Sequence, residues 1–238
     1  MDPDGEVVLS VTAGRVQVST WERAAVGVTA RLTSTAEAEG RIGPVQVEGG
    51  SDTVTIKRAG EEVEGGFWSL LGLGEAEGPE THYTLRVPRT ARLSISTKRA
   101  PVDVRGLAGE LTIEATSSPI RLHDTAGDVT VATFSGSLEA DSLRGDLLFA
   151  TFSGDATVRR RVLDGDNQLA SFSGSAEVTL PADAAFDLRT DITWGGEVTS
   201  DFVSPDSLGQ GEGPVLVSGG GPTVSFESFS GSLTLRAE

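Results

Sequence analysis

A four-residue motif recurs along the second half of the chain at nearly constant spacing. Thr133-Phe134-Ser135-Gly136 returns at residues 151–154, 171–174 and 228–231, with Thr or Ser in front of Phe-Ser-Gly each time. Residues 93–110, 111–128, 129–146 and 147–166 align as units of 18, 18, 18 and 20 residues. A looser unit starts at residue 167, another near residue 188, and the last at Pro222. Repeats this short and regular indicate a stacked architecture.

Eighteen residues are too few for a strand, a crossover helix and a second strand, but they suffice for two short strands and two tight turns. Apolar residues alternate within a unit, as at Val129 and Val131 and then Leu138 and Ala140, which is the period of a strand. Equal units with equal turns stack their strands in parallel. The sequence therefore predicts an all-β, single-stranded β-solenoid, and the crossover rule favours a right-handed coil.

We expect a single domain over residues 1–238. Residues 1–90 are predicted to be less regular strands that cap the solenoid, with strands at 45–47, 53–58 and 81–87. Residues 91–202 form the regular rungs, 203–221 a loop and 222–238 the closing rung. That closing rung is expected to present an open sheet edge at residues 232–236, which would allow homo-oligomers through the solenoid ends. The glycines of the repeated turn, Gly136, Gly154, Gly174 and Gly231, are predicted to need positive φ.

Composition excludes several classes of function. The chain has 19 Lys plus Arg against 35 Asp plus Glu, a net charge of −16, so the basic surface that nucleic acid requires is missing. It has no cysteine, which removes disulfides, thiolate nucleophiles and cysteine zinc sites. No apolar run reaches the 18 residues of a membrane span. The expected location is the cytoplasm or, if a leader has been removed, the cell envelope or exterior.

Four segments together resemble one family. Residues 9–32 (LSVTAGRVQVSTWERAAVGVTARL) are similar to the opening of the bacterial putative-adhesin, or toastrack, β-strand-repeat proteins. Residues 83–97 (YTLRVPRTARLSIST) resemble the Val-Pro element before the repeats of that family. Residues 133–146 and 219–236 resemble its repeat and its closing segment. The resemblance implies a β-solenoid without established catalytic residues. It also implies an association with envelope-stress signalling modules, often beside or fused to small membrane proteins.

One aromatic residue recurs at the repeated turn, giving a column of Phe134, Phe152, Phe172, Trp194 and Phe229. Strict alternation from Val129 and Val131 would place Phe134 outward, but a bend at the turn would reset the alternation. We expect a corner of the core, because large exposed apolar strips are rare on soluble monomers. The alternative is an exposed aromatic strip that binds sugars or a partner.

Two further segments are candidate partner-binding sites. The first is the apolar stretch within residues 65–80, a flap over the solenoid or an anchor in a partner; its anchor residues would be Phe67, Trp68, Leu70 and Leu71. The second is the dense basic cluster Arg159, Arg160 and Arg161, which either offsets neighbouring acids or docks an acidic partner.

Catalysis is not expected. The serines of the repeated turn have no recurring histidine beside them. The column of turn acids, Glu110, Asp128, Asp146 and Asp166, is too sparse for a calcium cage. Asp103, His123 and Asp124, with Arg105 and Arg121 nearby, form no complete catalytic set.

We therefore predict a non-enzymatic scaffold or protein-interaction module without cofactor or metal, with a membrane signalling protein as the candidate partner. A secreted or surface adhesin that binds glycan is the alternative, and a carbohydrate-active enzyme comes third.

Overall fold

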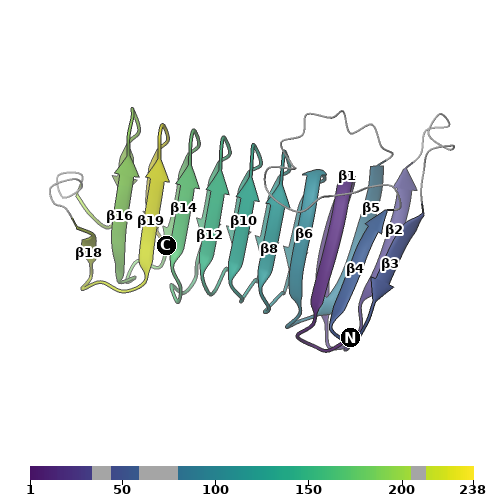
Figure 1. Cartoon of the computed structure of the whole chain (residues 1–238). Coiled ribbons are helices and arrows are strands. Elements are labelled where there is room, and N and C mark those ends of the chain that lie inside the picture. Colours follow the sequence, from purple (N-terminus) through teal and green to yellow (C-terminus); the bar gives the residue numbers. More distant parts are fainter. Residues whose placement is uncertain (34–43, 59–79, 205–212) are drawn as a thin grey trace.

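The computed structural model describes residues 1–33, 44–58, 80–204 and 213–238, and its regular elements there are strands. Twenty strands pair into a long, mostly parallel assembly that stays open at its ends. Figure 1 shows the rungs as a row of near-parallel arrows, with short turns at both edges. The predicted all-β solenoid is confirmed. Within the described ranges no helix is long and apolar enough to span a membrane.

Each rung contributes one strand to sheet A and one to sheet B. Strands of sheet A, in spatial order, are β3 (Val45–Gly49), β4 (Thr53–Arg58), the first half of β1 (Glu6–Trp21), β6 (Arg92–Arg99), β8 (Leu111–Ala115), β10 (Val129–Thr133), β12 (Leu147–Thr151), β14 (Asn167–Ser171), β19 (Thr223–Ser228), β16 (Phe186–Ile192) and β18 (Val215–Val217).

Strands of sheet B follow the same order: β2 (Gly27–Thr33), β5 (Glu80–Pro88), the second half of β1, β7 (Val102–Arg105), β9 (Ile120–His123), β11 (Leu138–Asp141), β13 (Ala156–Arg159), β15 (Ala176–Leu180), β20 (Leu233–Ala237) and β17 (Val198–Ser200).

The register of the parallel strands places equivalent repeat positions on top of one another. Val131 of β10 lies between Ile113 of β8 and Phe149 of β12, and all three are buried. Because side chains alternate along a strand, every second residue enters the space between the two sheets. The core is thus a set of apolar columns that run the length of the solenoid, and each rung is stabilised by its neighbours.

The N-terminal region supplies full rungs as well as the cap. Strand β1 pairs with β4 and β6 in sheet A and with β5 and β7 in sheet B, so it forms a complete rung. It passes from one sheet to the other near Gly14, whose φ of 125° is open mainly to glycine. Strands β3 and β2 then pair antiparallel with β4 and β5 at this end. Strand β1 thus lies inside the solenoid, and the role of residues 1–90 as a cap stays a prediction.

The C-terminal segment is not the end of the solenoid. Strand β19 lies between β14 and β16, and β20 lies between β15 and β17. The expectation of an open edge at β20 is wrong. At this end the edge strand of sheet B in the described residues is β17, while β18 covers β16 in sheet A by antiparallel pairing. Residues 222–238 carry the regular motif, so they stack on the last regular rung, and the divergent rung with Trp194-Gly195-Gly196 is left outermost.

The glycines of the repeated turn are needed for close packing and not for positive φ, which corrects the prediction above. None of Gly136, Gly154, Gly174 and Gly231 has a positive φ. A Cβ at Gly154 would lie 2.0 Å from the carbonyl oxygen of Gly136 one rung away, and one at Gly174 would lie 2.1 Å from that of Gly154. Backbone meets backbone at this turn, so only a residue without a side chain fits.

The acidic column at the other turn is a ladder of hydrogen bonds. The N–H of Asp146 donates to Asp128 Oδ1 (3.2 Å), and the N–H of Asp166 donates to Asp146 Oδ1 (2.9 Å). Thr223 N–H donates to Asp166 Oδ1 (2.6 Å), which ties β19 to the regular rungs. These carboxylates connect successive turns, and no group of three or more possible metal ligands was found within the described residues.

Candidate functional site

The phenylalanine column lies on the surface. Phe134, Phe152, Phe172 and Phe229 are 36%, 45%, 46% and 43% exposed. Successive ring centroids are 4.8–5.0 Å apart, and the ring planes lie within 1–3° of parallel. The expectation that the column forms a corner of the core is wrong. We call these four residues the phenylalanine ridge.

The outward direction of the rings follows from the residue before each of them. Val129, Val131 and Thr133 all point into the core, and Thr133 is completely buried. Its hydroxyl accepts a hydrogen bond from the N–H of Gly136 (2.8 Å), which closes the turn from inside. Alternation therefore continues into the turn without a reset, and Phe134 must face outward.

Trp194 does not belong to the ridge. The N–H of Thr193 donates to the carbonyl of Ser228, and that of Trp194 donates to the carbonyl of Phe229. In the regular rungs the phenylalanine makes the first of these two bonds and the following serine the second, as Phe229 and Ser230 do. Thr193 thus takes the position of the ring, and Trp194, 69% exposed, is displaced by one residue.

The ridge presents ring edges to solvent. Phe152 and Phe172 each have a parallel ring on both sides, so both of their faces are covered. The π-electron density of an aromatic ring lies on its faces, whereas its edge carries partial positive charge. The exposed surface is consequently an apolar ledge of C–H groups, and only the two terminal rings, Phe134 and Phe229, have a face that no other ring of the ridge covers.

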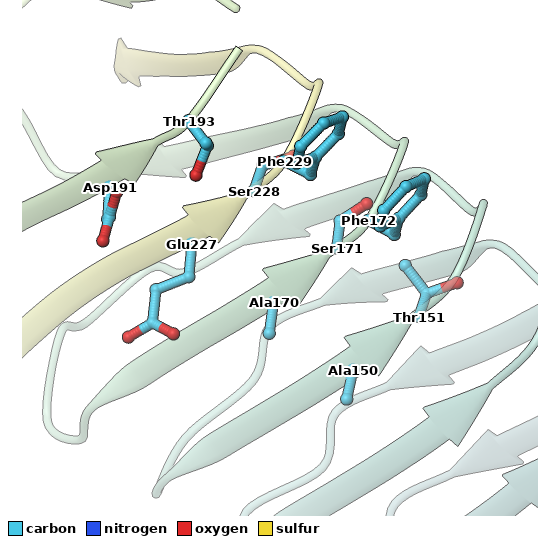
Figure 2. Close-up of a pocket in the computed structure, with 10 residues that line it drawn as sticks. All are labelled: Ala150, Thr151, Ala170, Ser171, Phe172, Asp191, Thr193, Glu227, Ser228 and Phe229. Atoms are coloured by element: carbon cyan, nitrogen blue, oxygen red, sulfur yellow. The ribbon is translucent and has the colours of Figure 1, made fainter.

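A shallow groove of about 420 Å³ runs beside the ridge on the outer face of sheet A. Its floor includes the methyl groups of Ala150 and Ala170, which are in register on β12 and β14. Figure 2 shows Phe172 and Phe229 along one side of this groove and Glu227 and Asp191 at the end formed by β19 and β16. The groove is lined by Ala150, Thr151, Ala170, Ser171, Phe172, Asp191, Thr193, Glu227, Ser228 and Phe229.

Apart from Phe172 and Phe229, the groove residues were not among the sequence candidates. Ala132, Ala150 and Ala170 hold the same position of the repeat, two residues before each phenylalanine, and alternation alone would have placed them outward. Glu227 holds the same position before Phe229, but no sequence pattern indicated that it would lie next to Asp191. They are neighbours only because β19 stacks between β14 and β16.

The three arginines predicted as one patch are separated. Arg159 is exposed and pairs with Glu238 (Nε–Oε2 3.2 Å), and Arg161 is exposed. Arg160 is only 2% exposed; its Nε donates to Asn167 Oδ1 (2.7 Å), and its Nη1 lies 3.8 Å from Asp164 Oδ1. Burial lowers the pKa of Arg160 to about 10, so the guanidinium remains charged at neutral pH. A docking patch here would consist of Arg159 and Arg161 alone.

The other predicted partner-binding residues, Phe67, Trp68, Leu70 and Leu71, lie outside the described residues. Their roles as a flap or an anchor stay predictions.

The acids and bases considered for catalysis contact one another on the outer face of sheet B. Asp103 accepts two hydrogen bonds from Arg105 (2.8 and 3.0 Å), and Arg121 pairs with Glu139 (3.1 Å). His123 Nδ1 lies 3.2 Å from Asp141 Oδ2. The hydrogen bond from Arg105 holds the pKa of Asp103 below its usual range, which is the wrong direction for a general acid.

These features define an elongated β-solenoid with an exposed aromatic ridge and an adjoining groove. No protein-family model matches the chain, and no curated protein matches it. Among solved structures it is similar to the crystal structure of a putative cell adhesion protein from Clostridium sporogenes, with 13% sequence identity and a TM-score of 0.47. The alignment covers 100% of this chain and 94% of that chain.

Proposed function

We propose that the protein is a non-enzymatic scaffold that docks a partner protein along the phenylalanine ridge. The observation that carries this proposal is the position of four aromatic side chains in one exposed, continuous row. Contiguous apolar patches on soluble proteins usually mark interaction surfaces, and aromatic residues are frequent binding anchors. The rings are stacked and held by a hydrogen-bonded turn, so little side-chain entropy is lost when a partner covers them.

Glycan binding is the second candidate, because it also requires an exposed ridge. Sugar rings commonly stack their C–H groups against aromatic faces, and the faces of Phe152 and Phe172 are covered by neighbouring rings. The ledge of ring edges is better suited to apolar protein side chains. We further propose that the partner is a membrane signalling protein and that the protein acts in envelope-stress signalling. This part of the proposal rests on the sequence resemblance alone.

Replacing Phe152 and Phe172 by threonine is expected to weaken peptide binding strongly and leave the fold intact. Threonine occupies the equivalent position in two other rungs, at Thr116 and Thr193, so the turn accepts it. Random 12-residue peptides displayed on phage would be selected on the wild-type protein and then measured on both proteins. Affinity should fall more than tenfold, the scale of an interface hot spot.

Val162→Ser is the matched control, because Val162 is 49% exposed and lies in a turn on the opposite edge of the rungs. A glycan array would be probed in parallel. Peptides that bind the threonine variant as tightly as the wild type would contradict the proposal. Glycan binding lost with the two rings would replace it by the second candidate.

A further inference from the structure

The groove passes from an apolar floor to an acidic end along a single row of residues. Ala150 is in register with Ala170, Ala170 with Glu227, and Glu227 with Asp191. All four side chains belong to the outer face of sheet A and line the same hollow. Phe229, the terminal ring of the ridge, lines the same groove. A ligand in this groove would contact methyl groups, ring edges and negative charge together.

The two acidic residues at this end, Asp191 and Glu227, lie in register on neighbouring strands. Glu227 and Asp191 are exposed and directly opposite on neighbouring strands, an arrangement that destabilises a sheet. No ion pair joins either of them to a cation in the described parts of the chain. On the outer face of sheet B the neighbouring rungs pair opposite charges instead, as in Arg121–Glu139 and Arg236–Glu177. A bound cation would relieve the repulsion between Glu227 and Asp191.

One kind of side chain matches both parts of the groove. Lysine and arginine carry an apolar stem of methylene groups that packs on apolar surface while the charged head stays in a polar environment. A stem lying on Ala170 and the edge of Phe229 would bring its head to Glu227 and Asp191. The net charge of −16 also favours a basic partner through long-range attraction.

We propose that the groove binds a lysine or arginine side chain from a basic segment of the partner protein, with apolar neighbours of that residue resting on the phenylalanine ridge. This inference rests on the proposed function, because it assigns the partner's chemistry to the surface proposed above. The ridge supplies apolar area, and the Asp191–Glu227 pair selects for positive charge.

The test uses the peptides selected from the phage library against the wild-type protein. We expect them to be enriched in lysine or arginine next to apolar residues. Fluorescence anisotropy would then compare one labelled peptide on the wild type and on the double variant Asp191→Asn, Glu227→Gln. Loss of two exposed charge pairs of about 0.5 kcal/mol each corresponds to roughly fivefold weaker binding, and the dependence of affinity on salt should also decrease.

The control is Asp4→Asn, Glu22→Gln, which removes the same charge at exposed positions outside the groove and should bind like the wild type. Ridge-dependent peptides that lack basic residues, or that bind Asp191→Asn, Glu227→Gln at wild-type affinity, would overturn this inference and leave the proposed function standing. The absence of any ridge-dependent peptide would overturn the proposed function itself. If both charge variants weakened peptide binding equally, the peptide would be attracted by the net negative charge of the protein and not by the Asp191–Glu227 pair.

Discussion

Replacing Gly154 by alanine should lower the melting temperature by roughly 10 °C. The added Cβ would lie 2.0 Å from the carbonyl oxygen of Gly136, a backbone atom fixed by its own rung. Overpacking of this kind costs about 3 kcal/mol or more, and in a chain of this length 1 kcal/mol corresponds to about 2–4 °C. Circular dichroism during heating, together with urea unfolding, would measure the change.

Gly50→Ala is the matched control for Gly154→Ala. No atom lies within 4 Å of a Cβ built on Gly50, and its φ is not positive. The same substitution there should leave the melting temperature unchanged or raise it slightly, because alanine restricts the unfolded chain. If Gly154→Ala had the same melting temperature as Gly50→Ala, the close approach of successive turns would not explain why glycine occupies position 154.

Replacing Arg160 by alanine should destabilise the protein by about 3 kcal/mol, since the change removes one partner of a buried polar pair and leaves a cavity. Asn167 Oδ1 would lose the hydrogen bond from Arg160 Nε, in a position completely shielded from water. Arg161→Ala, next to it but exposed, should change the free energy of unfolding by less than about 0.5 kcal/mol. Urea unfolding of the two variants gives the comparison directly.

A double replacement separates pairing from packing. Asn167 stacks on Leu147, with Val129 and Leu111 beyond it in the same buried column. In Arg160→Met, Asn167→Leu both polar groups become apolar, and such exchanges of a buried pair are often neutral or stabilising. We expect stability equal to or above that of the wild type. A double variant as unstable as Arg160→Ala would show that the charge itself is needed here.

Much of the solenoid could be predicted from the sequence, because each repeat unit carries the same pattern of apolar residues and turns. The alternation of Val129, Val131, Leu138 and Ala140 gave the strands, and the constant unit length gave their parallel stacking. The direction of Phe134 followed from the same alternation, but the low frequency of exposed aromatic strips favoured the opposite choice. The local signal was the better guide in this case, because Thr133 closes the turn from inside.

The order of residues along the chain could not reveal that Asp191 and Glu227 are neighbours or that Arg160 is buried. The neighbours of β16 and β19 depend on which rung stacks best on the regular ones, so the contact between Asp191 and Glu227 had no linear signature. Arg160 follows Arg159 and precedes Arg161 in a run that resembles a surface cluster. The unit from residue 147 to residue 166 has 20 residues instead of 18, and Asn167, polar at an otherwise apolar position, offers Arg160 an internal partner.

The stacking order of the rungs also has a consequence for biosynthesis. The slot between β14–β15 and β16–β17 is filled by β19–β20, which leave the ribosome after all four of those strands. The outermost rung therefore has no regular surface to stack on until translation of residues 222–238 is complete, and folding cannot finish strictly in the order of synthesis. At the other end β1 is synthesised before β4–β5 and β6–β7, the strands that enclose it. At both ends of the solenoid a terminal segment of the chain therefore lies inside the outermost strands, which should slow the end-fraying by which repeat proteins commonly begin to unfold.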